Sequence, residues 1–270
     1  MNKRTDVQIY ELAFNKVNYG FWDNSLYTPL QCGADRTNID VCELKDNTGD
    51  NISSKNFYYS ETTGTYWMWK NAPRTEFIGQ CQYRRRLEFV EDFMFDSVFS
   101  KCGIITSKPL FLGRTLRRQM EVCHPQIDIR ELENVVYKVA PEFADSFNNV
   151  FNYGCSLFFS SSYVMRHSDF DEYCGYLFAV LDEYSKRFGF DDEERLKSYV
   201  KNKLRNPSKD LKIKPIEYHM LIGGFIQERL FTSWILKRFT QSEIYYKDFK
   251  FMDPEASLKK MVRIAQKAAQ

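Results

Sequence analysis

Residues 50–86 read DNISSKNFYYSETTGTYWMWKNAPRTEFIGQCQYRRR, and this stretch sets the organisation of the chain. Its first half predicts a loop that feeds a helix, because Asn51 and the serines after it offer oxygens that can cap free N–H groups ahead of Asn56. Aromatic and threonine side chains then recur at helical spacing as far as Trp69, so one helix face should pack on the core. Gly64 costs about 1 kcal/mol relative to Ala in mid-helix, which indicates close approach of another element or a ligand.

The second half of the stretch, EFIGQCQYRRR at 76–86, predicts a short apolar strand that ends in three consecutive arginines. A strand whose end brings arginines to one rim of a sheet is suited to binding an anion. An earlier strand is predicted at 7–12, VQIYEL, and the loop after it should border a ligand in a nucleotide-binding α/β fold. Lys16 in that loop can approach a phosphate, although a solvated lysine is the alternative.

Later segments supply more helices and strands. We expect an amphipathic helix at 89–101, a helix that ends near Pro125, two helices split near Pro141 and a core helix at 168–188. The run 154–161 predicts a central buried strand, 191–215 predicts a solvated helix and loop, and the tail that begins at Ile244 has one edge-strand candidate ahead of Pro254. Strands that alternate with helices predict an α/β three-layer domain with a mixed central sheet and additional helices.

Composition bounds the class of protein. The 270 residues are 43% hydrophobic and 16% aromatic, enough for one large domain with a bulky core. The net charge of +2 is spread over mixed charges, which argues against a nucleic-acid partner. Seven cysteines without a C-x-x-C pair argue against a zinc ribbon or a disulfide framework. The sequence has no apolar segment of signal-peptide or membrane-spanning length, so a reducing cytoplasmic location is expected.

Two strings carry a family resemblance. SETTGTYWMWKN at 60–71 and FIGQCQYRRRL at 77–87 resemble the family called domain of unknown function 4422, whose motifs read approximately sEltalYWaWKN and yiGlcHYRRyf. The segments PLQCGAD at 29–35 and GDNISSKN at 49–56 are similar to an upstream part of that family. Further on, His124 and Asp128 match its H-x-x-x-D, and GFIQERL at 224–230 matches its G-f-x-x-E-R-L. The resemblance spans residues 7 to 240 in the same order.

This resemblance implies an activity. Members of the family look like glycosyltransferases of bacterial surface-polysaccharide assembly, including galactofuranosyltransferases. A GT-A-like, nucleotide-sugar-binding domain at 1–250 would then move a hexosyl unit, with galactofuranosyl as one option, from a donor such as a UDP-hexose. The acceptor would be a capsular or O-antigen glycan, free or lipid-linked. A basic amphipathic helix at 251–270 could contact the cytoplasmic face of the inner membrane, and packing on the domain is the alternative.

Glu228 is the first candidate for a general base and Asp128 the second. Glu228 follows Gly223 and Gly224 by about one turn in an apolar helix expected at 216–239, where a carboxylate is either ion-paired or chemically active. Arg229 should point about 100° away round the helix, so we expect the two charges not to neutralise one another.

The remaining site residues are assigned by motif and charge. His124 taken alone also fits a structural or capping role. Expected donor contacts are Lys16, Asp50, Asn51, Tyr83, Arg84 and Arg85, and expected contacts of donor or acceptor are His124, Gln82, Trp67 and Lys70.

Gln82 departs from the family pattern, which usually has His. Glutamine exchanges hydrogen bonds but cannot titrate near neutral pH, so position 82 cannot supply a general base. Either the family His has a binding role that glutamine shares, or this member differs in substrate or rate. A non-catalytic glycan-binding or assembly protein therefore stays open as an alternative, as does a glycoside hydrolase that uses paired carboxylates.

Asp46 and Asp50 invite comparison with the Asp-x-Asp metal motif of many sugar transferases. Their spacing differs, because D-N-T-G-D places a tight turn between the carboxylates and favours turn and capping roles. No metal site is assigned, and a divalent metal, Mg²⁺ or Mn²⁺, is kept as an alternative.

Overall fold

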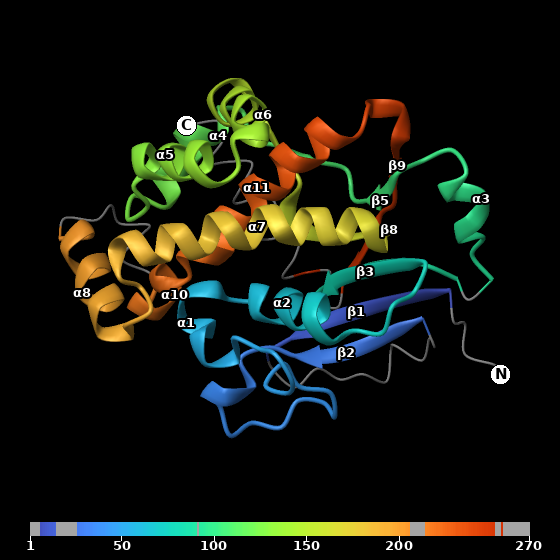
Figure 1. The fold of residues 1–270 in the computed structure, drawn as a ribbon, viewed down its shortest axis with the longest axis horizontal. Coiled ribbons are helices and arrows are strands. Elements are labelled where there is room, and N and C mark those ends of the chain that lie inside the picture. Colours follow the sequence, from blue (N-terminus) through green and yellow to red (C-terminus); the bar gives the residue numbers. More distant parts are fainter. Residues whose placement is uncertain (1–5, 15–25, 91, 206–213, 252–254, 256–270) are drawn as a thin grey trace.

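The computed structural model describes residues 6–14, 26–90, 92–205, 214–251 and 255. Its main sheet is mixed, as predicted (Figure 1). The strands of this sheet are β1 (Val7–Ala13), β2 (Tyr27–Gln31), β3 (Phe77–Gln82), β4 (Arg85–Leu87), β5 (Ile104–Thr106), β8 (Tyr163–Arg166), β9 (Ile244–Tyr246) and β10 (Phe249–Phe251). β1 lies between β2 and β3 and is parallel to both. β3 continues antiparallel to β8, and β8 is antiparallel to β5.

The helices lie mainly on one side of the parallel strands. They are α1 (Asn56–Tyr59), α2 (Thr62–Asn71), α3 (Phe95–Phe99), α4 (Leu116–Cys123), α5 (Ile129–Val139), α6 (Pro141–Tyr153), α7 (His167–Phe188), α8 (Glu193–Lys203), α10 (Ile216–Met220) and α11 (Ile222–Arg238). Figure 1 shows α7 crossing the middle of the molecule, with α4, α5 and α6 grouped beyond it and α2 between it and β1. Helix α7 packs on α2, α5 and α11.

The pleat of the strands separates two apolar clusters. Tyr10 and Leu12 of β1 and Ile78 of β3 belong to the large cluster shared with the helices. Ile9 and Phe77, from the same strands, belong to a smaller cluster with α3 on the other face. Successive side chains of a strand alternate between faces, so the direction of each polar side chain in β3 and β4 follows from its register.

Several predicted elements are confirmed. β1, β3, α4, α7, the split between α5 and α6 at Pro141, and the edge strand β9 all lie where the sequence predicted them. The polar segment after residue 191 does form a helix, α8. Gly64 is confirmed as a point of close approach by another element, since a Cβ there would lie 2.6 Å from Cys32 Sγ and 2.9 Å from Leu12 Cδ2.

Other predicted elements are wrong. The run 154–161 does not form the central strand, because β7 (Ser156–Leu157) pairs with β6 (Leu110–Phe111) in a separate sheet, and β8 takes the central place. The helix expected at 89–101 is only the short α3. The first aromatic helix breaks at Ser60, and the helix expected at 216–239 divides at Leu221 into α10 and α11.

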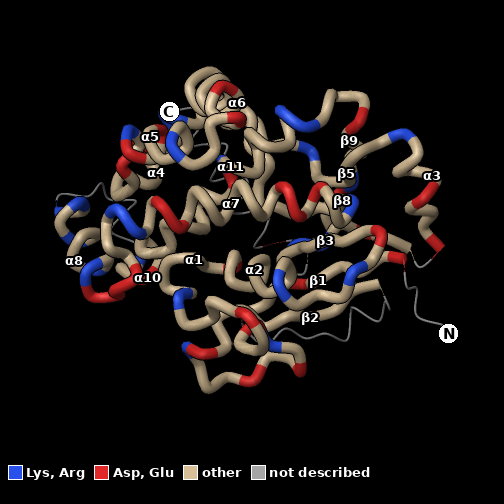
Figure 2. Tube along the Cα trace, in the orientation of Figure 1, with Lys and Arg blue, Asp and Glu red and all other residues tan. Residues whose placement is uncertain are grey.

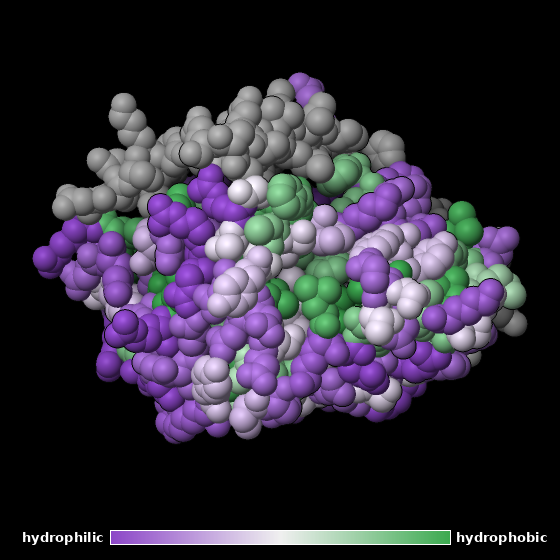
Figure 3. All heavy atoms as spheres, turned by 90° about the horizontal axis from the view of Figure 1, so that it is seen from above, coloured by the Kyte–Doolittle hydropathy of each residue, from purple (hydrophilic) through white to green (hydrophobic). Residues whose placement is uncertain are grey.

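The surface carries mixed charge. Figure 2 shows Lys and Arg interspersed with Asp and Glu on the outer helices, without a large area of one sign in this view. Seen from above, the molecule is mostly hydrophilic, with hydrophobic residues gathered toward the middle of that face (Figure 3). Among the described helices, we find none with the length and apolar character needed to span a membrane. The basic helix predicted at 251–270 falls almost entirely outside the described residues.

Candidate functional site

The candidate site lies at the edge of the sheet where β1 and β3 end. The strand order changes direction at β1, which has β2 on one side and β3 on the other, and ligands of open α/β sheets bind at such a point. Polar side chains from α2, β3, β4, α11 and the turn before β8 gather there. We call this group the carboxylate site; its members are Glu61, Gln82, Arg85, Ser160 and Glu228.

Glu228 projects from α11 and is held at both oxygens. Its Oε1 accepts a hydrogen bond of 3.1 Å from the backbone N–H of Ser160, and its Oε2 accepts one of 3.0 Å from Arg229 Nη1. The side chain is 15% exposed. Burial raises the pKa of Glu228, and the charge of Glu61 adds to the rise, while Arg229, the Ser160 N–H and Arg85 oppose it. A partly accessible carboxylate with a raised pKa is suited to accepting a proton.

The expectation that Arg229 points away from Glu228 is wrong. A long side chain can turn back along the helix, so the 100° between adjacent Cβ positions does not keep the charged ends apart. The Arg229 side chain is 1% exposed and also donates to the carbonyl of Phe225, at 2.7 Å, and to Gln119. Burial lowers the pKa of Arg229, and Glu228 opposes that change. Glu228 is therefore both an ion-pair partner and a candidate base.

A second carboxylate, Glu61, stands at the start of α2. Its Oε1 accepts a hydrogen bond of 2.5 Å from Gln82 Nε2, and its Oε2 accepts one of 2.5 Å from Ser60 Oγ. The sequence-based assignment did not include Glu61. A signal was present, because Glu61 is the only charged residue between Lys55 and Lys70 in an otherwise aromatic and polar segment. A lone charge in such a segment indicates a specific partner or a function.

The three arginines of the motif have different burial and different contact partners. Arg86 is buried and pairs with Glu11 of β1 at 2.8 Å. Arg85 points to the opposite face, as the pleat requires, and its guanidinium stacks 4.4 Å from the ring centroid of Phe159. Arg84 is exposed and lies 5.0 Å from the ring centroid of Tyr83.

Arg85 is the arginine that belongs to the carboxylate site. The residue is 8% exposed, and its Nη1 has no hydrogen-bond partner among the described residues. Burial lowers the pKa of Arg85, while Glu228 and Glu61 raise it and Arg84 lowers it further. A buried guanidinium with an N–H left over is suited to an anionic ligand.

Backbone strain is concentrated at this site. Ser60, Ser160 and Ser161 are the non-glycine residues with positive φ among those described, at 55°, 66° and 42°. Ser160 directs its N–H at Glu228, and the carbonyl of Ser161 accepts a hydrogen bond of 2.9 Å from Gln80 Nε2. Strained backbone of this kind is found at ligand sites, where the surrounding contacts hold it in place.

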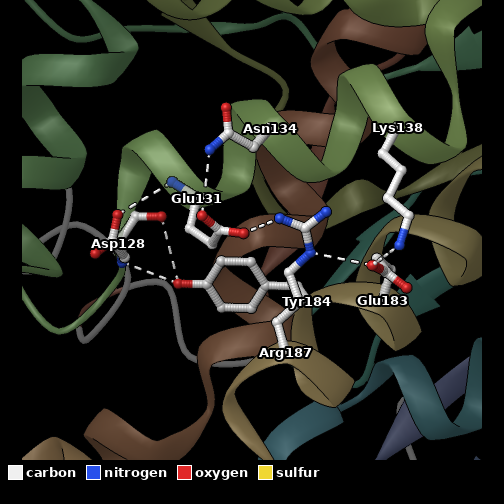
Figure 4. A network of polar contacts seen from close by, with 7 residues as sticks. All are labelled: Asp128, Glu131, Asn134, Lys138, Glu183, Tyr184 and Arg187. Carbon is white, nitrogen blue, oxygen red and sulfur yellow. Dashed lines mark hydrogen bonds and ion pairs between the residues drawn. The ribbon is translucent and has the colours of Figure 1, made fainter.

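Asp128 lies away from the carboxylate site in a structural setting. Its side chain caps α5 by accepting a 3.1 Å hydrogen bond from the Glu131 N–H, and its own N–H contacts the hydroxyl oxygen of Tyr184 at 2.9 Å (Figure 4). The same network joins Glu131 to Arg187 and continues to Glu183 and Lys138. The side chain of Asp128 is 38% exposed, with Lys203 Nζ at 3.9 Å.

His124 and Asp128 have different contact partners. His124 ends α4 and stacks on Phe225 of α11, with ring centroids 3.9 Å apart. Burial lowers the pKa of His124, and the charges of Arg229 and His219 lower it further, so the ring is neutral. The ring is buried against α11, and its Nδ1 has no hydrogen-bond partner among the described residues.

Two further predicted contacts, Asp50 and Asn51, lie in the segment before α2. Asp50 accepts a 3.1 Å hydrogen bond from Tyr66, and Asn51 closes a turn by donating to the carbonyl of Gly49 at 3.0 Å. Asp46, the other carboxylate compared with a metal motif, accepts hydrogen bonds from the N–H groups of Gly33 and Ala34 at 2.7 and 3.0 Å. These contacts favour the capping role for Asp46, whereas the Asp50 side chain binds a side chain of α2.

Trp67 and Lys70 make local contacts. Trp67 is buried and donates to Thr48 at 2.9 Å, while the ammonium of Lys70 lies 3.4 Å from the ring centroid of Trp69. Lys16 falls outside the described residues. Over the described parts of the chain, no group of three or more His, Cys, Asp or Glu side chains is placed to hold a metal ion.

A separate cavity of 320 Å³ lies at the opposite edge of the sheet. It is bordered by Arg166 at the end of β8, by Lys101, and by the ion pair of Asp169 with Arg238, whose atoms are 2.8 Å apart. The cavity is open and polar, and it shares no residue with the carboxylate site. We place the chemistry at the carboxylate site because both the strained turns and the unpaired Arg85 N–H are found there.

Comparisons with known proteins agree with this architecture. The structure is similar to one described as the apo form of the bifunctional glycosyltransferase WbbM, with a TM-score of 0.68 and 19% sequence identity over 91% of this chain and 45% of that chain. At that identity the likeness shows the fold, which is GT-A-like, and the chain spans less than half the length of the matched protein. No curated protein sequence matches the chain. Because residues 8–206 match the model of the family described as domain of unknown function (DUF4422), the chain belongs to that family.

Proposed function

We propose that this protein is a glycosyltransferase that moves a hexosyl unit from a nucleotide diphosphate sugar to a hydroxyl group of a glycan. The observation that carries the proposal is the placement of Glu228, a partly accessible carboxylate with a raised pKa, in the same site as the unpaired N–H of Arg85. A base and a cation are the two groups that such a transfer needs. The GT-A-like fold supports the assignment.

The proposed reaction is a direct displacement. Glu228 accepts the proton of the acceptor hydroxyl while that oxygen attacks the anomeric carbon of the donor. The bond between the anomeric carbon and the diphosphate oxygen breaks, and the nucleotide diphosphate leaves with the electron pair. Arg85 stabilises the charge that grows on the leaving phosphate, and exposed Arg84 adds to the local positive charge.

The contacts of Glu228 are compatible with this role. An ionised carboxylate offers about four lone-pair positions, and the Ser160 N–H and Arg229 Nη1 use two of them. A hydroxyl group can therefore still donate to Glu228. The fixed donors hold the carboxylate in one orientation, which aligns the base before the acceptor arrives.

The finer assignment follows the family resemblance. A UDP-hexose is the proposed donor, with galactofuranosyl as one option for the transferred group, and a capsular or O-antigen glycan is the proposed acceptor. The reaction would take place in the cytoplasm. The basic segment 255–270 would bring the enzyme to an anionic membrane surface that carries lipid-linked acceptor.

A panel of nucleotide sugars tests the proposal. The purified protein is incubated with each UDP-hexose, with and without glycan acceptors, and release of nucleotide diphosphate is measured beside the formation of a glycan product. Acceptor-dependent release that falls in Glu228→Gln supports a transferase. Cleavage of simple glycosides without a nucleotide would favour a hydrolase, and glycan binding without either reaction would favour a binding protein.

A further inference from the structure

Glu61 is fixed close to both groups to which the proposed reaction assigns roles, Arg85 and Glu228. It is hydrogen-bonded to Gln82, and Gln82 is the direct register partner of Arg85 across the β3–β4 hairpin. Glu61 therefore lies beside the cation that faces the leaving phosphate. The charge of Glu61 accordingly raises the pKa of Arg85.

Ser60 links Glu61 to α11. Ser60, whose hydroxyl donates to Glu61, packs so closely on Gly224 that a Cβ at that glycine would lie 2.8 Å from Ser60 Cβ. Gly224 and Glu228 are four residues apart and so lie on the same face of α11. Glu61 is therefore close to the candidate base as well, in agreement with its influence on the pKa of Glu228.

The positions of Arg85, Glu61 and Glu228 suit the leaving phosphate, the transferred sugar and the attacking hydroxyl of a displacement reaction. The leaving phosphate and the attacking hydroxyl lie on opposite sides of the sugar that is transferred. A group that lies close to both Arg85 and Glu228 is therefore within reach of that sugar. This step rests on the proposed function, because it takes Arg85 as the phosphate ligand and Glu228 as the base.

We propose that Glu61, oriented by Gln82, binds a hydroxyl group of the transferred sugar and so determines which sugar the enzyme accepts. An ionised carboxylate only accepts hydrogen bonds, and a sugar hydroxyl donates one. Gln82 and Ser60 each occupy one position on a different carboxylate oxygen, which leaves further lone pairs on both. Glu61 is partly exposed, so these positions can be reached from the site.

Gln82 has a positioning role in this proposal. Its amide holds Glu61 without adding a charge, so the full negative charge of the carboxylate is available to the sugar. Replacing Gln82 by methionine keeps the length of the side chain and removes the donor. Glu61 would then be free to change rotamer, and sugar selection should weaken without being lost.

The test compares hydroxyl recognition in wild type and in Glu61→Gln. The substrates are the UDP-hexose that gives the fastest nucleotide release in the panel and its monodeoxy analogues, each lacking one hydroxyl. In the wild type, we expect one analogue to lose about tenfold or more in kcat/KM, as for a hydroxyl bound by a charged group. In Glu61→Gln, the parent donor should lose a similar factor, and the same analogue should lose little more.

Matched variants separate recognition from folding. Glu131→Gln changes a partly buried glutamate outside the site, one that is ion-paired with Arg187. This variant should leave the wild-type discrimination intact. Gln82→Met should give an intermediate discrimination ratio. If Glu61→Gln melts well below the wild type, Glu61→Asp, which keeps the charge and withdraws it by one methylene, is measured instead and should also lose discrimination. Wild-type discrimination against every analogue in folded Glu61 variants would overturn the proposal while leaving the transferase assignment intact.

A failure of the transferase assignment would be visible separately. If the wild type releases nucleotide from no donor, binding of UDP-galactose and UDP-glucose and their monodeoxy analogues is measured by calorimetry. Loss of hydroxyl discrimination in Glu61→Gln would then still support recognition by Glu61. Unchanged discrimination, or the absence of any sugar binding to the wild type, would overturn it.

Discussion

Replacing Glu228 by glutamine tests the mechanism most directly, since it keeps the size of the side chain and removes the proton acceptor. A positioned general base contributes about 10²–10⁴-fold to a rate, so turnover should fall by that factor. Donor affinity should change little, because the proposed donor contacts belong to Arg85. The reason for expecting a large effect is the fixed geometry, in which both carboxylate oxygens already have donors.

The same substitution should lower stability by a limited amount. Glutamine offers one acceptor oxygen, so either the Ser160 N–H or the Arg229 guanidinium loses its partner. A buried donor left unpaired costs about 1–3 kcal/mol. The melting temperature should fall by about 2–4 °C for each kcal/mol in a chain of this size. Arg229 keeps its bond to the carbonyl of Phe225, which limits the loss.

The pH dependence adds an independent readout. Since the pKa of Glu228 is raised above 4.5, the folded protein holds this proton more tightly than the unfolded chain does. Stability should therefore fall as pH rises from about 4.5 through the folded pKa of Glu228, and this component should be missing from Glu228→Gln. Turnover by the wild type should rise over the same window, as the base loses its proton.

The assay is nucleotide release at a temperature well below both melting points, with Glu131→Gln as the matched control. A folded Glu228→Gln protein with wild-type turnover would refute the role of Glu228 as base. A Glu228→Gln variant that loses turnover only in proportion to its unfolded fraction would show that the Glu228 carboxylate acts only as the ion-pair partner of Arg229.

Further predictions concern the other assigned residues. Arg85→Ala should raise the calorimetric Kd for the nucleotide sugar about tenfold or more, because a charge-assisted contact is lost, and unchanged affinity would contradict this. Arg86→Ala should lower the free energy of unfolding by about 3–5 kcal/mol in denaturant titrations, since it leaves a buried carboxylate of β1 unpaired. Asp128→Ala should remove an N-cap at about 1 kcal/mol with no change in KM; a raised KM would return Asp128 to the site. Deleting residues 255–270 should reduce recovery with anionic vesicles while activity on a soluble acceptor persists, and loss of folding would show that the segment packs on the domain.

The parts of the fold that sequence predicted are those with a strong local period. Strands β1 and β3 and helix α7 carry regular apolar patterns, and all three were found. The central strand was missed because the run at 154–161 has the composition of a buried strand, whereas β8 is a run of four residues that ends in Arg166. Which run pairs with β3 depends on contacts far apart in the chain, and local composition does not contain them.

The site was predicted in part for a similar reason. The motif identified Gln82, Arg85 and Glu228, and the structure brings these three together with Glu61. Spacing alone could not show that Arg229 turns back onto Glu228, because a flexible side chain is not fixed by the direction of its Cβ. The helix break at Ser60 places Glu61 at the start of α2. The sequence did not predict this break, because serine rarely adopts positive φ.

The three serines with positive φ imply a conflict between thermal stability and turnover. Each of Ser60, Ser160 and Ser161 holds a sparsely populated backbone conformation with positive φ, which costs about 1–3 kcal/mol. Glycine would relieve that cost, offset in part by its larger entropy when unfolded, but Ser60→Gly would also remove the hydroxyl that holds Glu61. Selection of variants for heat resistance should therefore accept substitutions at these turns that selection for sugar transfer rejects.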